Sequence, residues 1–135
     1  MSRLWLDANV ILRFLTKDPP AMAERSARLM ANAERGEVSL FMSPLVLAEV
    51  IWVLKSFNRY SMTAIAHVIV SLVSAPGIEI DSRELIIRAV ELARDRNVDF
   101  ADAYLALQAA KRGQTVYTFD ESDFRRLPVE WMVPE

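Results

Sequence analysis

Two aspartates stand where apolar stretches of the sequence end, which is the edge at which α/β proteins bind their ligands. Asp7 follows the apolar residues 3–6, and Asp120 follows the alternating residues 115–119. Both stretches have the pattern of a β-strand. Each aspartate also has a simpler interpretation, since Asp7 could cap a helix and Asp120 could be an ordinary loop acid.

Two further acids lie inside predicted helices. Glu49 is surrounded by apolar residues, and a buried carboxylate needs a partner or a metal ion. Asp102 lies between two alanines, whose small side chains let other groups approach the helix closely. The alternatives are an exposed glutamate on a polar stripe of its helix, and an aspartate that only stabilises the helix dipole.

Four polar residues close to these acids have smaller expected roles. The Asn9 amide could bind a neighbouring carboxylate or cap the backbone. Asp99 is expected to cap the helix that follows it, and Thr118 places a hydroxyl on the alternating position of its strand. Asp123 is expected to cap or decorate a short helical turn.

Composition limits the available chemistry. The sequence contains no cysteine and a single histidine, which excludes disulfides, Cys-ligated zinc, iron–sulfur clusters and cysteine nucleophiles. His67 lies among apolar residues and is interpreted as a tolerated helix residue. Any catalysis must therefore depend on carboxylates.

The pattern along the chain predicts an α/β fold in a single domain over residues 1–135, close to the roughly 150 residues of an average domain. Strands and helices alternate, which predicts a short parallel sheet of about four to five strands with helices on both faces. The predicted strands are 3–6, 38–42, 78–80, 115–119 and, at the edge, 130–133. Six helices are predicted. The first starts near residue 9, the next three cover 20–35, 45–57 and 62–74, the fifth begins at 81–84, and the sixth covers 100–112.

This topology could bring Asp7, Glu49, Asp102 and Asp120 into one pocket. Four carboxylates close together repel one another, so such a cluster implies a bound cation or strongly raised pKa values. Oxygen ligands without histidine or cysteine favour Mg²⁺, or Mn²⁺, over Zn²⁺. A metal held in this way suits the hydrolysis of phosphodiester bonds.

The same residues lie in motifs that resemble those of PIN-domain ribonucleases, and more narrowly the VapC toxins of bacterial and archaeal toxin–antitoxin pairs. The resemblance spans essentially the whole chain, and the motifs occur in the order of the family. They are residues 6–13 (LDANVILR), 44–50 (PLVLAEV), 99–106 (DFADAYLA) and 118–120 (TFD), the last followed by Asp123-Phe124. Ala8 departs from the Ser or Thr of many relatives and leaves the neighbouring acid intact.

The resemblance implies that Asp7, Glu49, Asp102 and Asp120 are the catalytic, metal-binding acids. It implies supporting roles for Asn9, Asp99 and Thr118. It also implies Mg²⁺-dependent cleavage of RNA, a homodimer, and inhibition by a cognate antitoxin of the small DNA-binding type, whose C-terminal segment occupies the active-site groove.

The net charge of −2 leaves only local basic patches for RNA binding. Candidates are Arg13, Lys17, Lys55, Arg59, Arg125 and Arg126, each of which could equally belong to an ordinary solvated surface.

The apolar helices near 45–54 and 62–73 suggest a homodimer interface and a hydrophobic groove for the antitoxin. Neither a secretory signal nor a membrane-spanning run is visible, so we expect a cytoplasmic protein without membrane contact.

Two alternatives remain open at this point. A receiver-like module also gathers acids around Mg²⁺ and acts in regulation, but it requires a lysine near the last strand and an acid pair near the first. Lys111 lies in a predicted helix and Asp7 stands alone. The other alternative is a PIN domain that has lost catalysis and serves as a regulatory binding module.

Overall fold

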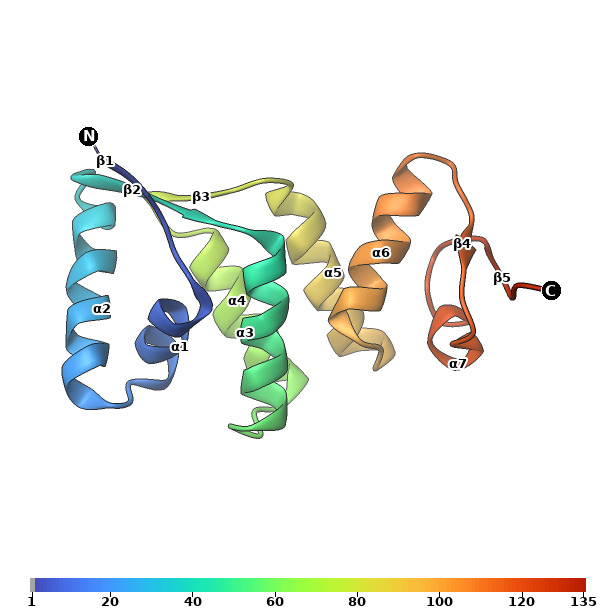
Figure 1. The fold of residues 1–135 in the computed structure, drawn as a ribbon, viewed down its shortest axis with the longest axis horizontal. Helices are drawn as coiled ribbons and strands as arrows, with labels where there is room; N and C mark the ends of the chain where they lie inside the picture. The colour runs from blue at the N-terminus through green and yellow to red at the C-terminus, as the bar shows by residue number, and fades with distance from the viewer. Residues whose placement is uncertain (1) are drawn as a thin grey trace. The chain divides into compact units, whose positions relative to one another are not determined.

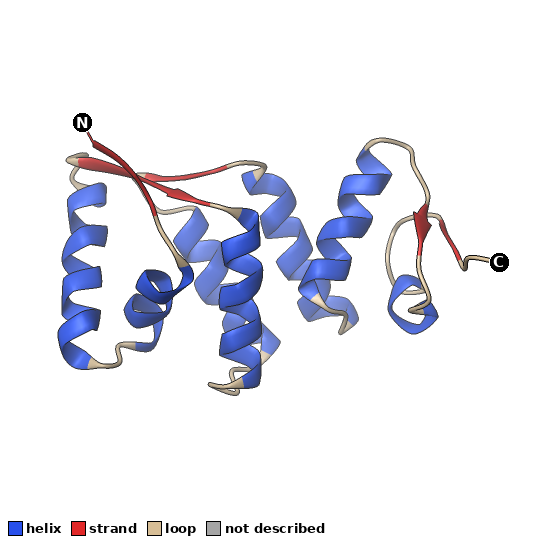
Figure 2. Cartoon of the chain, viewed as in Figure 1, coloured by secondary structure: helices blue, strands red, loops and turns tan. Residues whose placement is uncertain are grey.

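The computed structural model describes residues 2–135, which contain five strands and seven helices (Figures 1 and 2). In chain order they are β1 (Ser2–Trp5), α1 (Ala8–Thr16), α2 (Pro20–Glu34), β2 (Val38–Met42), α3 (Pro44–Ser56), α4 (Met62–Val73), β3 (Ile78–Ile80), α5 (Arg83–Arg96), α6 (Phe100–Lys111), β4 (Val116–Tyr117), α7 (Glu121–Phe124) and β5 (Trp131–Met132). The chain forms two compact units. The first ends at Arg83 and the second covers Glu84–Glu135.

The first unit contains a parallel three-stranded sheet in the order β1-β2-β3. Leu40 of the central strand pairs with Leu4 on one side and with Ile78 on the other. In Figure 1 these strands run along the top of the unit, above helices α1 to α4. The parallel pairing predicted from the alternation of strands and helices is confirmed. The sheet has fewer strands than the four or five expected.

Helices α3 and α4 each begin after a serine that caps them. The Ser61 hydroxyl accepts from the backbone N–H of Ala64 (3.1 Å), and the Ser43 hydroxyl accepts from Leu45 N–H (3.2 Å), with Pro44 in the first turn. Helix α1 packs against α2 and α3, and α3 packs against α4. Their facing sides supply the core, which includes Ile11, Leu47, Val50, Leu54, Ile65 and Ile69.

Gly77 marks the tightest approach in this unit. Its φ of +81° is a left-handed conformation, and a Cβ built there would lie 2.4 Å from the carbonyl oxygen of Ala33. Glycine therefore allows the turn before β3 to lie against the end of α2.

The second unit is built from α5, α6 and a small parallel sheet of β4 and β5 that flanks α7. Val116 pairs with Trp131, and Tyr117 pairs with Met132. The strands expected over 115–119 and 130–133 are therefore two residues long each, and they form a separate sheet. Apolar faces of the helices, including Ile86, Val90, Ala103 and Leu107, are buried.

Within the described residues, none of the helices combines the length and the apolar character needed to cross a membrane.

Candidate active site

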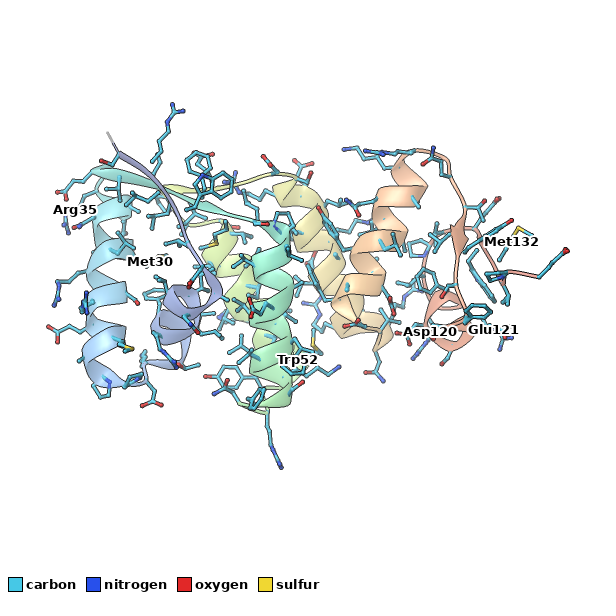
Figure 3. The ribbon with its side chains drawn as sticks, viewed as in Figure 1. Met30, Arg35, Trp52, Asp120, Glu121 and Met132 are labelled. Carbon is cyan, nitrogen blue, oxygen red and sulfur yellow. The ribbon has the colours of Figure 1, made fainter. Side chains whose placement is uncertain are left out.

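Three aspartates of the second unit come together between α6 and α7. Asp102 lies in the first turn of α6, Asp120 is the N-cap residue of α7, and Asp123 lies within α7. One carboxylate oxygen from each can be chosen so that all three lie within 4.8 Å of one another. Asp120 is labelled in Figure 3. Because these are oxygen ligands only, the cluster has the chemistry of a site for a hard divalent cation.

The loop before α7 holds Asp120 through two hydrogen bonds. The backbone N–H of Asp120 donates to the Thr118 hydroxyl (2.9 Å). In turn, Asp120 Oδ1 accepts from the backbone N–H of Asp123 (3.1 Å), which caps α7. Thr118 therefore shapes the turn that presents Asp120.

Both carboxylate oxygens of Asp123 accept hydrogen bonds from other groups of the chain. Oδ2 accepts from the backbone N–H of Asp99 (3.2 Å), and Oδ1 accepts from the Arg126 guanidinium (2.9 Å). Asp99 was expected to cap α6 with its side chain, but it makes no such bond, and its backbone is tied to α7 instead. Asp123 thus links the start of α6 to α7.

Arg126 is tied to α5 as well as to the acidic cluster. Its NH1 donates to the Arg96 carbonyl (3.2 Å), Arg96 NH1 donates back to the Arg126 carbonyl (3.1 Å), and Arg126 Nε donates to the Ser122 carbonyl (3.2 Å). All three nitrogens of the Arg126 guanidinium therefore donate. These hydrogen bonds hold the Arg126 side chain in place. Among the described residues, Arg126 is the only cationic residue that forms an ion pair with an acid of the cluster, Asp123.

The electrostatics of the cluster centre on Asp102, which is half-buried. Burial, then the charge of Asp99, a hydrogen bond with Asp123 and the charges of Asp123 and Asp120, raises the pKa of Asp102 to about 6. One guanidinium does not balance this many carboxylates. A pKa raised by burial and like charges in this way is typical of a functional site, and a bound cation would relieve the repulsion.

The first unit holds the other two predicted acids. Asp7 is exposed, and its Oδ1 accepts from the backbone N–H groups of Asn9 (2.8 Å) and Val10 (3.3 Å), which confirms the capping interpretation. Glu49 is exposed on α3, so the expectation that it is buried among apolar residues was wrong. The structure brings Asp102 and Asp120 together; the convergence of Asp7 and Glu49 with them stays a prediction.

Sequence reasoning missed the place of Asp123 in the cluster, because it assigned this residue only a capping or surface role. A signal was present. Asp120 and Asp123 are three residues apart at the start of a helical turn, as are Asp99 and Asp102, and this spacing places two side chains on one face of a helix.

Four of the six candidate RNA-binding residues lie at several places in the first unit, and the other two, Arg125 and Arg126, lie in the second unit directly after α7. Arg13 lines a pocket between α1 and α2. Lys17 ends α1 in a left-handed conformation (φ 59°), Lys55 is exposed in the last turn of α3, and Arg59 is exposed in the loop that follows. They stay predictions.

Comparison with known protein families decides the identity of the fold. A model of the PIN domain matches residues 4–130, nearly the whole chain. The chain belongs to the PIN-domain family. PIN domains are generally nucleases and typically bind a divalent metal, which agrees with the clustered aspartates. The receiver-like alternative is thereby set aside.

Comparisons of this PIN domain with individual proteins show only distant similarity. None of the curated proteins is significantly similar in sequence. Among solved structures, the chain is similar to one from a crystal structure of VapBC2 from Rickettsia felis bound to a DNA fragment from its promoter, with 19% identity and complete coverage of both chains. The TM-score is 0.36, so no function is transferred from it.

Proposed function

We propose that this PIN domain is a Mg²⁺-dependent endoribonuclease, with Mn²⁺ as a substitute metal, and that it is the toxin of a type II toxin–antitoxin module. The observation that carries the proposal is the cluster of Asp102, Asp120 and Asp123 in a chain of the PIN family. The donor set consists of carboxylates alone, which fits a hard divalent cation. Burial and the unbalanced negative charge of the cluster raise the pKa of Asp102.

Within the cluster, the hydrogen bonds separate the proposed ligands from the residue that positions them. Both oxygens of Asp123 already accept from Arg126 and from Asp99 N–H. Asp102 and Asp120 are therefore the better metal ligands, and Asp123 orients them. Asp7 and Glu49 are proposed to complete the set of acids, with Asn9 supporting Asp7.

A divalent cation bound by these acids would activate water and stabilise the leaving oxygen of a phosphodiester. The residues of the chain provide the rest. Thr118 fixes the turn that presents Asp120, Asp123 links α7 to the start of α6, and Arg126 ties Asp123 to the end of α5. Asp102 gives up its proton more readily once a cation is present, since the cation offsets the neighbouring negative charge.

Cleavage of RNA tests this proposal directly. Purified protein should cut a structured RNA with Mg²⁺ and lose activity in EDTA, and Asp7→Asn and Asp102→Asn should each reduce the rate by more than about 100-fold. Asp95→Asn is the matched control, because Asp95 is an exposed acid that pairs with Arg94 outside the cluster. Activity that survives both EDTA and the two substitutions would refute the proposal. RNA binding without cleavage would favour a silent PIN module.

The toxin role and the oligomeric state rest on separate grounds. The resemblance of the motifs to VapC toxins supports a cognate antitoxin partner and a cytoplasmic site of action. Exposed apolar side chains on and after α3 support a homodimer: Leu45 is 80% exposed and Phe57 is 72% exposed, and Trp52, labelled in Figure 3, contacts Phe57 edge to face. Sedimentation over a range of concentrations tests the homodimer, and a constant monomer mass would count against it.

A further inference from the structure

A pocket between α1 and α2 combines positive charge with an apolar wall. Its volume is about 520 Å³, within the range of sites for small ligands. Arg13 and Arg25 supply the charge, and Val10, Met22 and Leu29 supply the apolar surface. None of the residues that line it is acidic. The lining therefore suits a ligand with both an anionic and an apolar part.

In the described part of the chain these two arginines have no acidic partner, unlike Arg28 on α2 and Arg35 directly after it. Arg28 pairs with Glu24 at 2.9 Å, and Arg35 pairs with Glu37 at 3.1 Å. Within residues 2–135, neither Arg13 nor Arg25 forms an ion pair with an acidic side chain. Arg13 makes one long contact, from NH1 to the Asp18 carbonyl at 3.5 Å. Both guanidinium groups are therefore available to an anion, and arginine suits phosphate because it can donate two parallel hydrogen bonds.

The pocket begins beside the acid that is proposed to be catalytic. Asn9 and Val10 line it, and the backbone N–H groups of these same residues donate to Asp7 Oδ1. Arg13 lies one helical turn further along α1. A strand of RNA whose cleaved bond lies at Asp7 would therefore have a neighbouring nucleotide at this pocket.

We propose that the pocket between α1 and α2 holds one nucleotide of the RNA next to the cleaved bond, with its phosphate on Arg13 and Arg25 and its base against Met22 and Leu29. This inference rests on the proposed ribonuclease function and adds a subsite to it. Met22 is 52% exposed, which leaves its side chain free to cover a base. Apolar contact with a base face does not depend on its identity, so the subsite contributes affinity more than sequence preference.

The test compares Arg25→Gln and Arg13→Gln with Arg28→Gln, a control on α2, the helix that carries Arg25. Binding of a fluorescein-labelled RNA stem-loop is measured by fluorescence anisotropy in an Asp102→Asn background, at several salt concentrations. The Arg25 and Arg13 variants should bind about 5–10-fold more weakly, and each should lower the slope of log affinity against log salt by about 1. The control should match the parent. In the active protein, KM should rise and kcat should change little.

The outcomes separate this inference from the proposed function. If the active protein cleaves RNA, and the Arg25 and Arg13 variants keep the affinity and salt slope of the Arg28 control, the subsite is refuted while the ribonuclease stands. If the parent neither binds nor cleaves RNA, both fail. Arg25 is exposed, so its variant should fold normally, and thermal unfolding of each variant checks this.

Discussion

The raised pKa of Asp102 leads to an unusual expectation: without metal, at about pH 7.5, the Asp102→Asn variant should be more stable than the parent. Burial and the nearby carboxylates raise the pKa of Asp102 to about 6, from its usual value of 3.8. The folded protein therefore holds this proton more tightly than the unfolded chain does. The stability contributed by Asp102 is fully present below pH 3.8 and is lost as the pH rises through 6.

The size of the effect follows from the two pKa values. A pKa of about 6 in place of 3.8 corresponds to about 3 kcal/mol of unfolding free energy. Because the Asp102 side chain is only half-buried, solvent screens much of this energy, and we expect about 1 kcal/mol. The amide of asparagine has a similar size and no charge, so the substitution removes the repulsion without opening a cavity.

Urea unfolding in EDTA, followed by circular dichroism, measures this difference. The gain for Asp102→Asn should appear at about pH 7.5 and disappear at about pH 4. Asp95→Asn is the control, because a hydrogen bond from Arg94 lowers the pKa of Asp95, and its loss should not stabilise the protein. Saturating Mg²⁺ should reverse the order, since only the parent binds it tightly. A variant less stable than the parent at about pH 7.5 in EDTA, or a gain independent of pH, would refute the reasoning.

Three further substitutions test the positioning of the cluster, the packing and the interface. Arg126→Ala should weaken Mn²⁺ binding about 10-fold, measured by calorimetry, because Asp123 loses its guanidinium partner. Gly77→Ala should cost about 3 kcal/mol in urea unfolding, because the new Cβ would lie 2.4 Å from the Ala33 carbonyl oxygen at a positive φ. Trp52→Glu should shift the protein toward monomer in sedimentation, since the residue is 58% exposed on α3.

The first two substitutions have matched controls. Arg125→Ala removes an arginine that pairs with Glu121 rather than with the cluster, so equal loss of Mn²⁺ binding in both variants would contradict a positioning role for Arg126. Gly36→Ala shares the positive φ but meets no atom within 4 Å, so it should cost only about 1 kcal/mol. Equal costs at Gly36 and Gly77 would mean that close packing is unimportant. A Trp52→Glu variant with unchanged mass would place the dimer interface elsewhere.

Local signals in the sequence predicted the helices to within one or two residues. Ser43 and Ser61 start α3 and α4 because their hydroxyls satisfy free backbone N–H groups. The lengths of the strands were harder to predict, because they depend on how many residues the neighbouring strand pairs with. Residues 115–119 alternate well, yet only Val116 and Tyr117 form a ladder with β5. Residues 3–6 were expected to form a buried strand, but β1 covers Ser2–Trp5, lies at the edge of its sheet and is exposed.

The sequence predicted part of the acidic cluster but did not predict the orientation or the burial of every acid. Asp102 and Asp120 lie in one cluster, as expected for two of the four acids that were predicted to share a pocket. Asp123 was missed because its orientation depends on the turn of α7 and on Arg126, which lies on no recognisable motif. Glu49 was expected to be buried because its neighbours are apolar, but that side of α3 exposes apolar residues such as Trp52 too, so composition could not show which face is inside.

The central claim is that Asp102 and Asp120 bind a divalent cation. Crystals grown with Mn²⁺ and measured at the manganese absorption edge test it most directly. We expect an anomalous peak about 2.1 Å from carboxylate oxygens of both residues, and its loss in Asp120→Asn. A peak only elsewhere on the protein, or no peak at millimolar Mn²⁺, would contradict it.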